Sequence, residues 1–165
     1  MIVFTRIDDR LIHGQVVEGW VNFLKATAIL VADDRVASNA LQRSIMEISA
    51  PQGLGVFIGT VENVCGRLST PAPGNERAIL LFSTPADVLR ALKLGLDCRA
   101  LNIGGMHYVP GKRKLIDVLA VDDRDLEALR EIAARGIKVE IQAVPSQKPL
   151  TLEKLFKVCR LGEKT

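Results

Sequence analysis

A short polar segment near the N-terminus contains the side chains best suited to chemistry. It reads R-I-D-D-R-L-I-H-G-Q-V over residues 6–16 and includes His13, one of only two histidines in the chain. An imidazole can act as a nucleophile, a general base or a metal ligand. Zinc sites use three or four ligands at workable spacing, and neither the second histidine nor a cysteine lies near His13. We therefore expect a nucleophilic histidine, with no metal and no cofactor.

The residues around His13 suit the binding of an anion such as a phosphoryl group. Gly14 lets the backbone approach a bound group closely. The amides of His13, Gly14 and Gln15 are expected in the first turn of a helix, where unpaired N–H groups and the helix dipole attract negative charge. Arg10 adds a planar fork of donors that matches phosphate oxygens. The segment thus predicts a histidine beside a small cradle for an oxyanion.

Two consecutive carboxylates, Asp8 and Asp9, precede this cradle. Either of them can orient the imidazole or hold the arginine, and we place Asp9 among the phosphoryl-binding residues. The alternative for the whole segment is an ordinary helix N-terminus, with a histidine there by chance and charges that pair in solvent.

Short apolar runs alternate with amphipathic stretches along the chain, which is typical of an α/β fold with a mostly parallel sheet and helices on both faces. Strands are expected at residues 2–6, 28–32, 54–58, 78–82, 100–103 and 137–144, with another short one within 115–121. Helices are expected at residues 13–25, 35–49, 60–68, from 84 onward, 122–136 and 151–159. The alternating pattern of the strand at 137–144 favours a sheet edge with one wet face.

Individual residues within these elements carry more specific expectations. Trp20 lies in an apolar helical stripe and is expected in the core. Leu41, Ile45 and Ile48 are expected to face inward from one continuous helix. The aspartates at 33–34 follow a strand and either cap the next helix or bind a metal, and capping is the commoner use.

Length and composition narrow the class of protein. The 165 residues suit one domain, residues 1–165, and 48% of them are hydrophobic. A net charge of +3 is too mild to indicate nucleic acid. We expect no signal peptide and no membrane span. The three cysteines are unpatterned and are expected to be free, at least partly buried thiols of a reducing compartment.

The segment at residues 6–16 resembles the active-site loop of the IIB components of the mannose/fructose/sorbose family of bacterial sugar phosphotransferase systems. Three further segments resemble the family in the same order, L-L-F-S-T-P-A-D-V at Leu80–Val88, N-I-G-G-M at Asn102–Met106 and A-R-G-I at Ala134–Ile137. The resemblance extends to about Val144.

This resemblance implies a role for each part of the site. His13 receives a phosphoryl group on its δ nitrogen from a phosphohistidine of the IIA component, and Arg10 steadies that group. The phosphoryl group then passes to a sugar carried by the membrane components IIC and IID. The protein is therefore expected in the cytoplasm, held peripherally at the inner face of the membrane through IIC and IID, and a homodimer is compatible with this role.

The resemblance also implies a seven-stranded sheet in the order 3-2-1-4-5-6-7, with the last strand antiparallel. In that order the direction of connection reverses between the first and fourth strands, and ligands bind at such points. The loop after the fourth strand then meets the His13 loop, so we expect Ser83 and Thr84 to help bind the phosphoryl group. The site is expected to be shallow, because two protein partners must reach it.

The segment after Met106 departs from the family. The family usually continues with Ala-Phe, whereas this chain has His107 and a basic loop to Lys114. That loop is either solvated surface or a docking patch, and His107 is a less favoured candidate for a second catalytic histidine. The departure motivates one alternative function, a regulatory phosphohistidine module without sugar transport. A nucleotide-binding Rossmann protein is disfavoured because no G-x-G-x-x-G follows the first strand.

Overall fold

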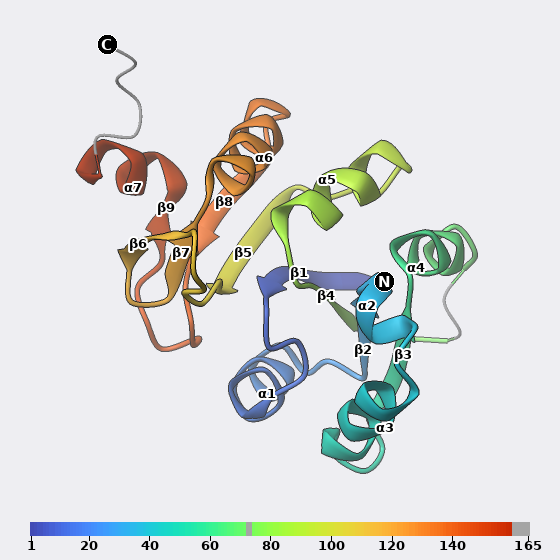
Figure 1. The fold of residues 1–165 in the computed structure, drawn as a ribbon. Helices are drawn as coiled ribbons and strands as arrows, with labels where there is room; N and C mark the ends of the chain where they lie inside the picture. Colours follow the sequence, from blue (N-terminus) through green and yellow to red (C-terminus); the bar gives the residue numbers. More distant parts are fainter. Residues whose placement is uncertain (72–73, 160–165) are drawn as a thin grey trace.

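A seven-stranded sheet forms the centre of the computed structural model, which describes residues 1–71 and 74–159 (Figure 1). Across the sheet the order is β3-β2-β4-β1-β5-β8-β9, parallel except for the last pair. The strands are β1 (Ile2–Asp8), β2 (Ala28–Ala32), β3 (Gly55–Gly59), β4 (Ala78–Phe82), β5 (Ala100–Gly105), β8 (Lys138–Ile141) and β9 (Leu150–Thr151). A separate antiparallel ribbon joins β6 (Arg113–Ile116) and β7 (Leu119–Val121).

Helices cover both faces of the sheet, so the expected three-layer α/β fold is confirmed. On one face lie α4 (Val61–Leu68), α5 (Pro85–Lys93) and α6 (Asp123–Ala134), with α7 (Leu152–Val158) near the edge. The other face is covered by a helix that starts with a π-helical part, η1 (Gln15–Val21), and continues as α1 (Asn22–Leu24), and by α2 (Asp34–Ala37) and α3 (Ala40–Ser49). Each face encloses its own apolar cluster.

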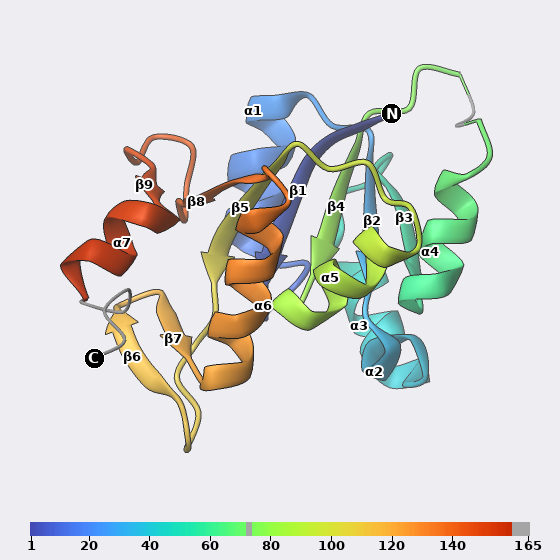
Figure 2. The ribbon, with the colours of Figure 1, turned by 90° about the horizontal axis from the view of Figure 1, so that it is seen from above.

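The order of the two central strands differs from the expected one. β4 lies between β2 and β1, so the sequence-based order 3-2-1-4 is wrong and the chain has 3-2-4-1. All five residues of β4 are buried apolar ones, which suits a strand flanked on both sides and covered on both faces. β1 is consequently flanked by β4 and β5, and Figure 2 shows these three strands running side by side in one direction. The loops after β4 and β5 therefore both border the loop after β1.

The edge of the sheet also differs from expectation. The strand at 137–144 is not at the edge, because β9 pairs with β8 on its outer side. β9 is the antiparallel last strand, and it ends at Thr151, where we expected a helix to begin. The expected short strand within 115–121 belongs to the β6–β7 ribbon and not to the main sheet.

The predicted helix at 35–49 is two helices, because the Asn39 side chain accepts from the Gln42 amide and starts a new helix. After this break the apolar stripe of α3 no longer faces the sheet. Leu41, Ile45 and Ile48 are 70%, 55% and 83% exposed, so their expected inward orientation is wrong. The α3 face is thus an unburied apolar surface near the carboxyl ends of the strands.

Local signals elsewhere are confirmed. Asp33 caps α2 through the Val36 amide, as expected for an aspartate after a strand. Thr84 also caps α5, and Asp122 forms a capping box at α6. Trp20 is buried and stacks on Phe4, with ring centroids 4.3 Å apart. The three cysteines are free and half-buried.

Candidate active site

A buried ion pair forms the base of the site. Arg6 and Asp8 lie two residues apart on β1 and therefore share one face of the strand. Both side chains are 0% exposed, and Arg6 Nη2 lies 2.8 Å from Asp8 Oδ2. The Arg6 guanidinium also donates to the Asn102 side chain and to the carbonyls of Gln142 and Ala143, the last two at 3.0 and 3.1 Å. Such a pair is stable in the interior only because its remaining donors are satisfied.

Gly104 makes room for this arginine. A Cβ at this position would overlap Nη2, Cζ and Nε of the Arg6 guanidinium. The Trp20 ring covers the guanidinium from another side, with Cζ 5.5 Å from the ring centroid. The Gly-Gly of the N-I-G-G-M segment is therefore a place where side chain and backbone approach closely, which only a residue without a Cβ allows.

Asp8 is the carboxylate that meets the imidazole of His13. Its Oδ2 lies 3.0 Å from His13 Nε2, and its Oδ1 accepts the backbone N–H of Arg10 at 3.2 Å. Burial by itself would raise the pKa of Asp8. The hydrogen bond with His13 and the charges of Arg6, His13 and Arg10 outweigh it and lower that pKa to about 2. Asp8 is therefore a carboxylate at any physiological pH.

This contact determines which ring nitrogen of His13 is available. A carboxylate accepts hydrogen bonds only, so Nε2 carries the proton that points at Asp8. Nδ1 is then the atom with the free lone pair. The side chain is 16% exposed, so the ring is mostly covered and presents one edge. The sequence could not choose between Asp8 and Asp9 as the partner of the imidazole, and the structure places Asp8 there.

The loop between Asp8 and the helix bends sharply. Leu11 has a φ of 56°, a left-handed conformation that non-glycine residues rarely adopt, and its side chain is buried at 2% exposure. This conformation is held by the buried Leu11 side chain and by the hydrogen bond that the Leu11 N–H donates to the Asp8 carbonyl at 2.9 Å. Strained backbone held by its surroundings is common at functional sites. The bend turns the chain from β1 into η1 so that His13 faces back toward Asp8.

The expected phosphoryl-binding groups surround His13 on this loop. Arg10 lies over the loop, with Nη2 3.0 Å from Gln15 Oε1 and Nε 3.4 Å from Asp8 Oδ1, and its side chain is 40% exposed. A Cβ at Gly14 would meet nothing within 4 Å, so the space next to this residue is open. Among the described residues, the amides of His13 and Gly14 have no recorded acceptor. Their role in binding a phosphoryl group stays a prediction that this geometry permits.

Asp9 binds the other histidine, and no contact with His13 is recorded for it among the described residues. Its Oδ1 lies 2.6 Å from His107 Nδ1, and its Oδ2 accepts the His107 backbone N–H at 2.6 Å. Asp9 in turn donates its own N–H to the Gly105 carbonyl at 3.0 Å. The sequence predicted that Asp9 contacts the phosphoryl group. In the structure both of its carboxylate oxygens already contact His107, so that predicted contact would have to compete with them.

Ser83 and Thr84 follow β4, next to β1, but other groups occupy their hydroxyls. The Ser83 hydroxyl donates to the buried Asp33 carboxylate. The Thr84 hydroxyl accepts the Asp87 N–H at 3.2 Å and lies 2.7 Å from the Asp87 carboxylate. The structure brings the two residues to the same end of the sheet as His13 without a recorded contact to it.

Two of the surface hollows formed by the described residues lie at opposite ends of the sheet, and neither is lined by His13. One, of about 330 Å³, is lined by Asp9, Leu11 and Arg35 with Ile45 and Met46 of α3. This hollow lies between the bent loop and the exposed apolar face of α3. The two features therefore form one continuous surface that a protein partner can contact.

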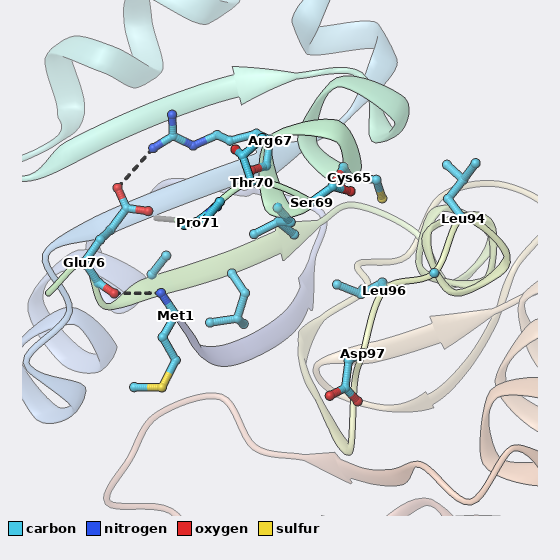
Figure 3. Close-up of a pocket in the computed structure, with 14 residues that line it drawn as sticks. Met1, Cys65, Arg67, Ser69, Thr70, Pro71, Glu76, Leu94, Leu96 and Asp97 are labelled. Carbon is cyan, nitrogen blue, oxygen red and sulfur yellow. Dashed lines mark hydrogen bonds and ion pairs between the residues drawn. The ribbon is translucent and has the colours of Figure 1, made fainter. Parts of the chain in front are cut away.

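A second hollow of about 670 Å³ lies where β1 and β4 begin, at the opposite end of the sheet (Figure 3). Arg67 pairs with Glu76 there at 3.0 Å, and the Met1 ammonium donates to the Glu76 carbonyl at 2.8 Å. Its place at the amino ends of the strands separates it from the His13 site.

Sequence reasoning missed Arg6 and Asn102 as parts of the site. A signal for Arg6 was present, because a charged residue inside an apolar strand needs a buried partner and Asp8 is two positions away on the same face. Asn102 became a neighbour only with the corrected strand order. The cations of the basic loop after His107 are paired within the chain, Lys112 with Asp125 and two others with Asp117 and Asp123.

Fold and site together define a class of protein. The chain has a parallel α/β sheet with a carboxylate-held histidine at the carboxyl end of its central strand, beside an arginine and the start of a helix. This arrangement suits a protein that carries an anionic group on an imidazole. The family model for the phosphotransferase system (PTS) sorbose subfamily IIB component matches residues 2–165, so the chain belongs to that family.

Relatives and solved structures agree with this assignment. The chain is 36% identical to the N-acetylgalactosamine-specific phosphotransferase enzyme IIB component 2 of Escherichia coli, over 94% of this chain and 98% of that protein. It is 35% identical to the sorbose-specific EIIB component of Klebsiella pneumoniae, over 88% of each. The crystal structure of the IIBSor domain of the sorbose permease from K. pneumoniae superimposes with a TM-score of 0.90, at 32% identity, over 96% of this chain and 97% of that one.

The chain is therefore a IIB phosphoryl carrier of a sugar phosphotransferase system, a class of enzyme that transfers a phosphoryl group from IIA to a sugar and works with IIA, IIC and IID components. The relatives are components of sugar-specific systems, which favours this role over the regulatory alternative. None of the described helices is both long and apolar enough to cross a membrane.

Proposed function

We propose that His13 accepts the phosphoryl group on Nδ1. The observation that carries this proposal is the 3.0 Å contact between Nε2 and the Asp8 carboxylate. It reserves Nε2 for a proton and leaves Nδ1 with the lone pair. The nucleophile of a histidine carrier must be such an unprotonated nitrogen.

The transfer is an in-line displacement at phosphorus. The lone pair of His13 Nδ1 attacks the phosphorus of the phosphohistidine on IIA, a new P–N bond forms and the donor P–N bond breaks. The ring of His13 gains positive character in this step, and the Asp8 carboxylate stabilises it. Positioning and charge stabilisation supply most of the rate in such transfers.

The oxygens of the phosphoryl group are bound by Arg10 and by the amides of Gly14 and Gln15. Arg10 is exposed enough to turn from Gln15 toward the group, and the space beside Gly14 is open to it. Ser83 and Thr84 act through the position of the neighbouring loop, because their hydroxyls hold Asp33 and Asp87.

Residues 1–165 act as one IIB domain that meets its partners at this surface. A mannose-specific EIIAB component of E. coli is 34% identical to the chain, which covers 48% of it, and that protein joins IIA and IIB in one polypeptide. This supports a IIA domain as the donor. The acceptor is a sugar presented by IIC and IID, through which the protein associates with the inner face of the membrane.

The test is phosphorylation in a purified system. The protein is incubated with phosphoenolpyruvate, the general phosphotransferase proteins and a IIA component of the mannose family, and intact mass reports the product. We expect one acid-labile phosphoryl group on the wild type and none on His13→Ala. No adduct on the wild type, with IIA phosphorylated in the same tube and a cognate IIA also tried, would overturn the proposal.

A further inference from the structure

A second imidazole is held at the rim of the same site. His107 lies two residues after the end of β5, and Asp9 binds both its ring Nδ1 and its backbone N–H at 2.6 Å. The two consecutive aspartates of the loop thus each hold one histidine, Asp8 holding His13 and Asp9 holding His107. One backbone segment therefore sets the positions of both rings.

The His107 ring and the Asp8 carboxylate both border Gly105. A Cβ at Gly105 would lie 2.9 Å from His107 Cε1, 3.5 Å from His107 Nδ1 and 3.5 Å from Asp8 Oδ1. The Nδ1–Cε1 edge of His107 thus lies near the carboxylate that orients His13. The register of β1 and β5, in which Asp8 pairs with Gly105, places them there.

The second ring nitrogen of His107 is accessible. Asp9 engages Nδ1, and among the described residues no partner is recorded for Nε2. The side chain is 45% exposed, so the ring can be reached from the surface that a partner protein covers. When both ring nitrogens of a histidine are protonated, both are donors. His107 can then donate to Asp9 through Nδ1 and to an anion through Nε2.

We propose that His107 is a second phosphoryl-binding residue, whose Nε2–H donates to an oxygen of the phosphoryl group on His13. The proposal rests on the assignment of His13 as the acceptor. The Asp9 carboxylate orients the His107 ring. A dianionic phosphoryl group nearby favours the doubly protonated, cationic ring, because an adjacent opposite charge stabilises the charged form. Arg10 and His107 then contact the group from two different loops.

The experiment measures how the phosphoryl group distributes between IIA and this protein. Wild type, His107→Gln and Asp9→Asn are each brought to equilibrium with phospho-IIA, and intact mass gives the ratio of the two phosphorylated forms. Charge-assisted hydrogen bonds contribute enough to expect a ratio lowered by about tenfold to a hundredfold in His107→Gln. Asp9→Asn lowers it less, because the ring stays but loses its orientation. Tyr108→Phe, next in the loop and 61% exposed, is the matched control and leaves the ratio unchanged.

A spectroscopic measurement on the wild type keeps the test independent of any misfolded variant. With ¹⁵N-labelled histidine, loading of His13 should shift the His107 ring signals to those of the doubly protonated form, and no shift should follow the same treatment of His13→Ala. An unchanged ratio in His107→Gln, or His107 signals that do not respond to loading, overturns the proposal. A wild type that takes no phosphoryl group from a phosphorylated cognate IIA refutes the assignment of His13 itself, which is a different result.

Discussion

Replacement of Asp8 by asparagine removes the negative charge of this buried side chain and keeps its size and shape. The Asp8→Asn side chain keeps its volume but leaves the Arg6 charge, which is 0% exposed, without its counter-ion. Breaking a buried pair in this way costs about 3–5 kcal/mol of unfolding free energy. The neighbouring variant Asp9→Asn loses only a pair whose side chains are 31% and 45% exposed, so it should cost less than about 1 kcal/mol. Urea unfolding of the two variants measures the difference.

The same substitution also removes the charge that stabilises His13 during transfer. Loss of one charge-assisted hydrogen bond should slow phosphorylation of the folded variant by about tenfold to a hundredfold. Quenched-flow phosphorylation by phospho-IIA, without urea and at a temperature where the variant is folded, measures this rate. Asp117→Asn, at a side chain 97% exposed, is the control and keeps the wild-type rate. The reasoning is refuted if the Asp8 and Asp9 variants unfold at the same urea concentration, or if Asp8→Asn is phosphorylated at the wild-type rate.

Further predictions concern the support of the site and the surface beside it. Gly104→Ala should displace the Arg6 guanidinium and cost about 2 kcal/mol, measured by thermal unfolding, with a matching loss of phosphorylation. The pKa of Asp8 is lowered to about 2 in the folded protein, so its contribution to the free energy of unfolding is present above pH 4 and is lost as the pH falls toward 2. Unfolding measured across this pH range should show a loss of about 2 kcal/mol in the wild type that Asp8→Asn lacks. Ile48→Ser, at a residue 83% exposed, should change unfolding free energy by less than about 0.5 kcal/mol, whereas Ile29→Ser, at 0%, should cost several kcal/mol in the same assay.

The parts of the fold that local chemistry determines were predictable from the sequence. Thr84 and Asp122 start helices because their side chains accept the amide of the residue three positions on, and both act as caps in the structure. The helix break at Asn39 was missed although an asparagine before an apolar stripe is also a cap signal. The long apolar stripe suggested one helix, and this error produced the wrong orientation of Leu41 and Ile45.

The site required tertiary information that periodicity does not contain. Asp8 and Asp9 are chemically identical, and only the turn of β1 into the loop decides that Asp8 meets His13 and Asp9 meets His107. The neighbourhood of His107 depends on β5 lying directly beside β1. With β4 placed between them, as in the strand order that the resemblance implied, His107 would be a strand farther from His13.

The position of the phosphoryl group on the His13 ring tests the account most directly. The protein is labelled with ¹⁵N in histidine, phosphorylated through IIA, and studied by ³¹P–¹⁵N correlation, which identifies the nitrogen bonded to phosphorus. The contact of Nε2 with Asp8 predicts a phosphoryl group on Nδ1 of His13. A phosphoryl group on Nε2, or on any other residue, would contradict the account.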